Sequence, residues 1–203
     1  RTRTDITKTM ARDRGKRAVL IAGPTASGKT ALAIARARTR GARIVNADSM
    51  QVYGVLDRLT ARPNAEELMQ ARHEMFGHVD PSVRYSTGAW LADAHKQIQE
   101  ADKENQELIF VGGTGLYFDA LVNGFAQVPA IDPEFVRQAE KLIQDRDEAG
   151  RMAVLVERDP ETARRLKVAD PQRVVRALSV LMATGKPLSA FQDANGPGLL
   201  DGY

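Results

Sequence analysis

The sequence predicts an α/β fold, in which a parallel sheet is flanked by helices and a helical subdomain is inserted. Three observations carry this prediction. Short continuous apolar runs at residues 18–22 and 108–111 are typical of parallel strands that are buried on both faces, and a further strand is predicted at 43–47. A helical pattern follows the first run, so strand and helix alternate. After about residue 125 the pattern becomes helical, with no strand run of comparable strength.

Start and stop signals place the helices of the first half. A helix is expected over 29–40, where alanine is frequent and Gly41 stands in position for a C-terminal cap. A longer helix is expected over 85–104, with Ser86 or Thr87 as its N-cap. Each of these helices lies between two predicted strands, as in a β-α-β unit.

The second half contains three further helix signals. Asp132-Pro133-Glu134 opens one helix, because proline is favoured in the first turn and aspartate before it. Helical stretches follow at 159–168 and 171–184. The glycine- and proline-rich residues 195–198 are typical of a loop.

Composition narrows the possible classes of protein. The chain has 203 residues, of which 43% are hydrophobic and 27% charged, so we expect a folded protein of one or two domains. It has no cysteine, which excludes a disulfide framework, a thiolate zinc site and a cysteine nucleophile. No apolar run approaches the roughly 18 residues that a membrane-spanning helix needs. We expect a cytoplasmic monomer without a membrane segment.

The formal net charge of +3 is unevenly placed along the chain. Residues 1–17 hold seven basic and two acidic side chains, and the remainder sums to −2. The sequence pI of about 9.3 is therefore no argument for nucleic-acid binding by the folded part. We expect a basic flexible arm at residues 1–17 and an α/β core at 18–125. A helical subdomain that faces its ligand is expected at 126–190, and a loop or truncated return to the core at 191–203.

Residues 23–30 match the phosphate-binding P-loop pattern at every defined position and lie between a predicted strand and a predicted helix. Glycines let backbone N–H groups curl around a phosphate, and the helix N-terminus adds positive potential. Lys29 is expected to reach a terminal phosphate, and Thr30 to hold Mg²⁺. The predicted phosphate-binding residues are Gly23, Pro24, Thr25, Ala26, Ser27, Gly28, Lys29 and Thr30.

A P-loop indicates phosphate binding without indicating the reaction. Many nucleotide-hydrolysing proteins and kinases carry an acidic residue at a strand end for magnesium, but the strand at 108–111 ends in Gly-Gly-Thr. Asp48 directly follows the strand at 43–47 and so belongs beside the P-loop. We expect it to be a general base or an outer ligand of magnesium, with a simple cap as the alternative.

Four stretches stand in a characteristic order along the chain. They are Gly-Pro-Thr-Ala-Ser-Gly-Lys-Thr at 23–30, Ala-Asp-Ser-Met-Gln-Val-Tyr at 47–53, Gly-Gly-Thr-Gly-Leu-Tyr at 112–117 and Asp-Pro-Gln-Arg-Val-Val-Arg-Ala-Leu at 170–178. In sequence and in order, these stretches resemble the motifs of the tRNA dimethylallyltransferase family. The resemblance implies transfer of a dimethylallyl group from dimethylallyl diphosphate to the exocyclic N6 amine of adenosine 37, beside the anticodon. It implies a diphosphate in the P-loop, Mg²⁺ as the cofactor and a tRNA anticodon loop as the partner.

The resemblance also assigns roles to single residues. Asp48 would accept the proton of the attacking amine, while Lys29 and Thr30 act on the leaving diphosphate. Thr114 matches a position that touches the tRNA near the reacting base. The residues assigned to tRNA binding are Asp48, Ser49, Met50, Gln51, Thr114, Arg137, Gln172, Arg173, Val174, Val175 and Arg176.

Helical spacing places Gln172, Arg173 and Arg176 on one side of the helix at 171–184, with its apolar residues largely facing inward. Spacing alone favours a solvated charged face, since most charged helix faces are of that kind. The resemblance instead implies a surface that binds the anticodon loop.

The sequence departs from the family pattern at three places, one of which is His73-Glu74 where two adjacent histidines are common, and other functions remain open. Leu59-Thr60-Ala61-Arg62-Pro63 stands where Gly-Thr-Ala-Lys-Pro is common, and members continue well beyond Gly185-Lys186-Pro187-Leu188-Ser189, so we expect a truncated chain. An adenylate isopentenyltransferase, which makes a cytokinin, would explain the P-loop and the base. A small-molecule kinase would explain the P-loop alone, and a nucleotide-dependent switch is the alternative outside enzymes.

Overall fold

The computed structural model describes residues 17–55, 62–126 and 128–203. The predicted basic arm lies outside these residues, apart from Arg17. So does Leu59-Thr60-Ala61, which is part of the stretch where the sequence departs from the family pattern. The chain forms two compact units. The first runs to Asp119 and takes in Leu199–Tyr203, and the second comprises Ala120–Gly198.

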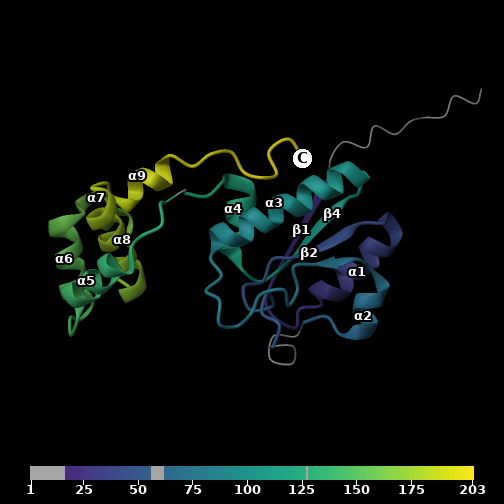
Figure 1. Ribbon diagram of the computed structural model, residues 1–203, viewed down its shortest axis with the longest axis horizontal. Helices are drawn as coiled ribbons and strands as arrows, with labels where there is room; N and C mark the ends of the chain where they lie inside the picture. The colour runs from purple at the N-terminus through teal and green to yellow at the C-terminus, as the bar shows by residue number, and fades with distance from the viewer. Residues whose placement is uncertain (1–16, 56–61, 127) are drawn as a thin grey trace, which may run out of the picture. The chain divides into compact units, whose positions relative to one another are not determined.

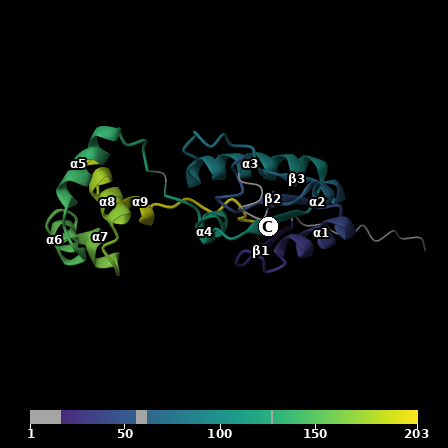
Figure 2. The ribbon, with the colours of Figure 1, turned by 90° about the horizontal axis from the view of Figure 1, so that it is seen from below.

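The first unit is built on a parallel four-stranded sheet with the strand order β1-β4-β2-β3. Figures 1 and 2 show helices α1 and α3 on opposite faces of this sheet. The predicted α/β class with a parallel sheet flanked by helices is therefore confirmed. The strands are β1 (Ala18–Ala22), β2 (Arg43–Asn46), β3 (His73–Glu74) and β4 (Leu108–Gly112).

Alternate residues of the central strands supply the two layers of the core. Ile44 and Ile109 pack with the buried face of α1, which spans Lys29–Arg40. On the other face, Phe110 meets the fully buried Trp90 of α3 in an edge-to-face contact, with ring centroids 6.3 Å apart. This alternation is the period-two pattern of a strand that is covered on both sides.

The first strand differs from its prediction, because it is not buried on both faces. β1 has β4 as its strand neighbour on one side, and it stands at the end of the strand order. Leu20 on this edge strand remains 38% exposed. An apolar run indicates a strand, but its burial depends on where the sheet places it.

The two predicted helices of the first unit are confirmed. α1 ends at Gly41, whose φ of 65° is the left-handed conformation of a C-terminal cap. α3 spans Thr87–Glu104, and the side chain of Ser86 accepts a hydrogen bond from the N–H of Ala89, so Ser86 is the N-cap. The tail of the chain also joins this unit, because the Tyr203 hydroxyl donates to Asp102 over 2.6 Å.

The second unit is helical (Figure 1, green and yellow). Its core contains Leu155, Val174 and Leu178, all fully buried. An aspartate caps each of four helices with its side chain: Asp132, Asp147, Asp159 and Asp170. The helices are α5 (Pro133–Ile143), α6 (Glu148–Arg158), α7 (Pro160–Arg165), α8 (Pro171–Thr184) and α9 (Leu188–Asp193).

The helical unit begins earlier and ends later than the predicted 126–190. The end of α4 (Gly115–Asn123) belongs to it, and residues 196–198 pack against that end. The packing is close, because a Cβ on Gly198 would collide with the carbonyl oxygens of Leu121 and Val122. Segments distant in sequence therefore define this boundary.

Several short elements were not predicted. α2 (Ala65–Gln70) has six residues and no buried one, and β3 is a two-residue strand that pairs with β2. α4, α6 and α9 were also missed, and the helix predicted at 159–168 ends at Arg165. α2, β3 and α9, with two to six residues each, carry too few residues for a periodic pattern, whereas α4 and α6, with 9 and 11 residues, are long enough to show one. None of the helices in the described ranges is long and apolar enough to cross a membrane.

Candidate active site

The P-loop joins β1 to α1, as predicted. Gly28 has a φ of 82°, which glycine adopts without strain, and no side chain caps the N-terminus of α1. A helix start without a side-chain cap leaves backbone N–H groups for an anion. The Lys29 ammonium donates a hydrogen bond to the carbonyl oxygen of Pro24, so it lies back against its own loop.

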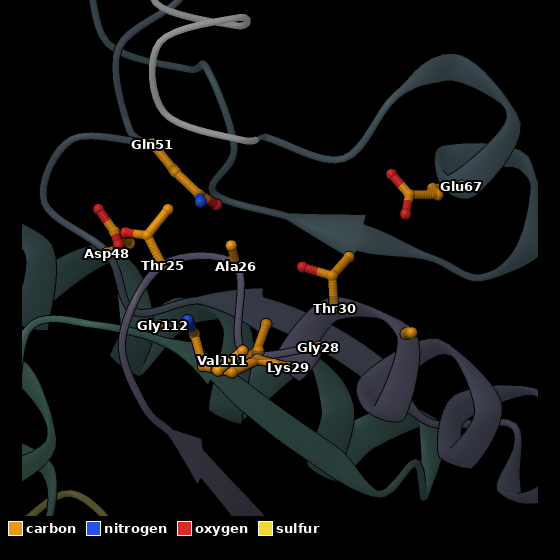
Figure 3. Close-up of a pocket in the computed structure, with 12 residues that line it drawn as sticks. Thr25, Ala26, Gly28, Lys29, Thr30, Asp48, Gln51, Glu67, Val111 and Gly112 are labelled. Carbon is orange, nitrogen blue, oxygen red and sulfur yellow. The ribbon is translucent and has the colours of Figure 1, made fainter.

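A cavity of about 290 Å³ opens at this loop. Figure 3 shows Asp48 and Thr25 on one side of the view, Glu67 on the other, and Thr30 between them. The residues that line it are Thr25, Ala26, Ser27, Gly28, Lys29, Thr30, Ala31, Asp48, Gln51, Glu67, Val111 and Gly112. Six of the eight predicted phosphate-binding residues line one cavity with Asp48 and Gln51.

Asp48 lies in a turn held by a buried neighbour. Asn46 is fully buried, and its side-chain oxygen accepts the N–H of Asp48 over 3.0 Å while its amide donates to the Asp48 carbonyl over 2.9 Å. Asp48 Oδ1 in turn accepts the N–H of Met50 over 2.9 Å. The indole N–H of Trp90 donates to the carbonyl of Asn46 over 2.9 Å, which ties this turn to α3.

Thr114 lies beside this turn because the ends of β2 and β4 are adjacent. Its hydroxyl oxygen accepts the N–H of Ser49 over 2.8 Å, and its own N–H donates to the carbonyl of Ala47 over 3.2 Å. Gly113 also adjoins Asp48, because a Cβ there would stand 3.1 Å from Asp48 Oδ2. The structure therefore brings together Asp48, Ser49 and Thr114, which are 65 or more residues apart across the two motifs.

An aromatic pair lies behind the Asp48 turn. Tyr117 is 2% exposed and stacks on Trp90, with ring centroids 4.2 Å apart and an interplanar angle of 9°. Burial, with Tyr53 and the negative charge of Asp48 nearby, raises the pKa of Tyr117 to about 12. The Tyr117 hydroxyl is therefore neutral near pH 7 and lies in the electrostatic field of Asp48.

Sequence reasoning missed two residues of this site. Glu67 lines the cavity from α2, and Asn46 holds Asp48. Asn64-x-x-Glu67 is a capping box, a sequence signal that would have predicted α2. No sequence signal shows that α2 stands over the P-loop, because that depends on tertiary packing.

The predicted RNA-binding residues of the second half lie in the helical unit. Gln172, Arg173 and Arg176 are exposed on α8. Val174 was assigned to the same surface, but it is fully buried in the helical core. Its side chain therefore offers no surface to a ligand, and its assignment to tRNA binding stays a prediction. Val175 is half-buried and packs against the same core.

Arg137 lies in the same unit, on α5. It is exposed and pairs with Glu134 one helical turn earlier. The candidate residues thus fall into two sets, one around the cavity of the first unit and one on α5 and α8 of the second.

The cavity contains oxygen donors that suit magnesium. Within the described residues, no group of three or more His, Asp or Glu side chains could by itself hold a metal ion. Mg²⁺ typically uses one or two carboxylates together with phosphate oxygens and water. The hydroxyl of Thr30 with one lining carboxylate, that of Asp48 or of Glu67, beside a phosphate-binding loop is such a donor set.

Comparison with known proteins finds a matching family model and several similar proteins. A family model described as IPP transferase matches residues 51–200. The tRNA dimethylallyltransferase of Methylobacterium nodulans is 51% identical over 187 residues, which are 92% of this chain and 61% of that protein. The tRNA dimethylallyltransferase of Rhizobium meliloti is 45% identical over 184 residues, 91% of this chain and 61% of that protein. The chain therefore spans about three fifths of the length of these relatives.

Solved structures are similar as well. A eukaryotic dimethylallyltransferase, in a structure described as acting on tRNA, has a TM-score of 0.74 and 28% identity, covering 91% of this chain and 46% of that one. The tRNA isopentenylpyrophosphate transferase of Bacillus halodurans has a TM-score of 0.54 and 31% identity, covering 85% of this chain and 57% of that one.

Proposed function

The chain belongs to the IPP transferase family, and from that premise we propose that the protein transfers a dimethylallyl group from dimethylallyl diphosphate to the exocyclic N6 amine of adenosine 37 in tRNA. The observation that carries the proposal is the cavity in which a P-loop and Asp48 face the same space. A phosphate-binding loop suits the leaving diphosphate, and a carboxylate beside it suits a proton acceptor. The names of the relatives support tRNA as the acceptor.

The P-loop would act on the leaving group. As the bond between the allyl carbon and the diphosphate oxygen breaks, negative charge grows on that oxygen, and donors positioned there lower the barrier. The N–H groups of the loop and the Lys29 ammonium, once it turns from the Pro24 carbonyl, are such donors. Thr30 would hold Mg²⁺, which supplies further positive charge to the diphosphate when bound.

Asp48 would act on the nucleophile. The adenine N6 nitrogen forms the new bond to the allyl carbon and must lose a proton, which Asp48 accepts. A base has to stand within hydrogen-bond reach of that proton, and the bonds from Asn46 hold the Asp48 turn in place for this task. The products are the N6-alkylated adenosine, diphosphate and the proton.

The exposed side chains of α8 and α5 would bind the anticodon loop. Arg173 and Arg176 offer positive charge to phosphates, and Gln172 offers an amide. Asp170 accepts the N–H groups of both Gln172 and Arg173, which fixes the first turn of α8. A base that is alkylated on its exocyclic amine has to leave its stack, and single-stranded loops permit this.

A competition assay tests the proposal against its alternatives. The protein is given dimethylallyl diphosphate and Mg²⁺ with AMP and an anticodon stem-loop together, and the modified nucleoside is measured by mass spectrometry. We expect the alkylated adenosine in the stem-loop alone. Alkylated AMP would instead support an adenylate isopentenyltransferase, and phosphate transfer from ATP without alkylation would support a kinase.

A further inference from the structure

The cavity at the P-loop contains an acidic side chain to which the proposed reaction gives no defined role. Glu67 of α2 lines the cavity together with Thr30. The charged lining residues are Lys29, Asp48 and Glu67, so the side chains carry a net charge of −1. A cavity for a diphosphate anion is expected to carry positive charge, because like charges close together repel. Glu67 thus opposes the anion unless a cation lies near it.

The local structure of α2 explains the position of Glu67 but not its charge. Its carboxylate accepts the N–H of Asn64 over 2.9 Å, and the Asn64 side chain accepts the N–H of Glu67 over 3.0 Å. This capping box holds the side chain in one orientation, yet glutamine caps a helix in the same way. A carboxylate has about four lone-pair sites, and one N–H bond leaves acceptor capacity for another ligand.

We propose that Glu67 is a ligand of the magnesium ion that accompanies the diphosphate. The inference rests on the proposed function, since it concerns the same cavity. A hard divalent cation prefers carboxylate oxygen and often keeps several waters, so a carboxylate on the cavity wall suits the hydrated ion. The ion offsets the repulsion between Glu67 and the diphosphate, and the capping box keeps the carboxylate ready for it.

Binding of inorganic diphosphate to the Glu67→Gln variant tests this role without relying on turnover. Glutamine keeps the capping bond and removes the charge. In EDTA, loss of the repelling carboxylate is expected to tighten diphosphate binding roughly three- to tenfold. In millimolar Mg²⁺, loss of the metal ligand is expected to weaken it roughly tenfold. Isothermal titration calorimetry of the wild type and the variant under both conditions measures the two shifts.

Glu66→Gln is the matched control. Glu66 is the preceding residue on α2, is exposed and does not line the cavity, so neither affinity is expected to change. Circular dichroism is expected to give the same thermal midpoint for the wild type and Glu67→Gln. Shifts of one sign under both conditions, or no shift, overturn the role of Glu67. If the wild type itself binds no diphosphate, the proposed function fails together with the inference.

Discussion

Asp48 owes its position to hydrogen bonds from residues that do not themselves line the cavity. Asn46 binds both the N–H and the carbonyl of Asp48, and Trp90 binds the carbonyl of Asn46. Asn46 is fully buried, so water does not compete for these bonds. A turn held from both ends presents its side chain in one place, which is what general-base catalysis requires.

Replacement of the Asp48 carboxylate tests its role in proton transfer separately from any role in substrate binding. Asp48→Asn keeps the acceptor for the N–H of Met50, but an amide takes no proton near pH 7. We expect kcat to fall about 10²–10⁴-fold, with little change in the affinity for dimethylallyl diphosphate. Single-turnover kinetics and calorimetry measure the two quantities. A large fall in affinity that excess Mg²⁺ restores would show instead that Asp48 organises the metal.

Asp80→Asn is the matched control for that substitution. Asp80 Oδ1 accepts the N–H of Ser82 two residues later over 2.9 Å, the same local bond that Asp48 makes with Met50. Asp80 does not line the cavity. We expect its replacement to leave kcat unchanged, so an equal loss in both variants would indicate damage to turns rather than to the base.

Helix α8 is divided lengthwise between a buried and an exposed side. Val174 and Leu178 are fully buried in the helical core, while Arg173 and Arg176 are exposed. The first turn is fixed by the side chain of Asp170, and Gly185 ends the helix with a φ of 69°. Rigid packing on one side therefore presents the arginines on a surface of defined shape.

Charge reversal on this helix tests it as an RNA-binding surface. The double variant Arg173→Glu, Arg176→Glu is expected to bind an anticodon stem-loop more weakly at low salt, with a flatter salt dependence. For each RNA phosphate that no longer pairs with an arginine, the log–log slope on single strands becomes shallower by about 0.7. Filter binding at a series of salt concentrations gives the slope, and calorimetry is expected to show unchanged diphosphate binding.

A second double variant, Arg158→Glu with Arg164→Glu, is its control. Both residues are exposed in the same helical unit, on α6 and α7, and the change in net charge is identical. Equal weakening by the two double variants would mean that only the overall charge acts on RNA. Unchanged binding by the α8 variant would identify its arginines as an ordinary solvated face.

At the scale of the whole molecule, a buried charge joins the sheet to helix α3. Arg43, at the start of β2, is fully buried, and its guanidinium donates to Gln97 and Glu100 over 2.8 Å and to Glu104 over 3.0 Å. The two carboxylates remain nearly half exposed. This cluster holds α3, and with it Trp90, against the sheet.

Arg43→Met is expected to lower the free energy of unfolding by about 1–3 kcal/mol, because it removes three hydrogen bonds and leaves two carboxylates without a buried partner. Arg72→Met is the control, since Arg72 pairs with Glu104 over 3.0 Å but is 46% exposed. Exposed pairs contribute below about 1 kcal/mol. Urea unfolding measures both, and equal losses would contradict a special role for the buried guanidinium.

The features predicted correctly from the sequence are those that neighbouring residues specify. The P-loop is eight consecutive residues between a strand and a helix, and its conformation follows from glycine and from the start of α1. Asp48 was placed beside it because the carboxyl ends of parallel strands meet at one edge of the sheet. The helical period predicted which side of α8 faces inward and which faces outward, including the inward position of Val174.

Only the tertiary structure shows what segments that are far apart in the sequence contribute to the cavity and to the core. Glu67 belongs to a six-residue helix whose sequence indicates a cap but no cavity, and Asn46 looks like one more residue of a buried strand. The exposure of β1 and the join between α4 and residues 196–198 likewise depend on which segments pack together. Local propensity acts over a few residues, whereas charge in a cavity and burial of a strand arise from contacts between segments far apart in the chain.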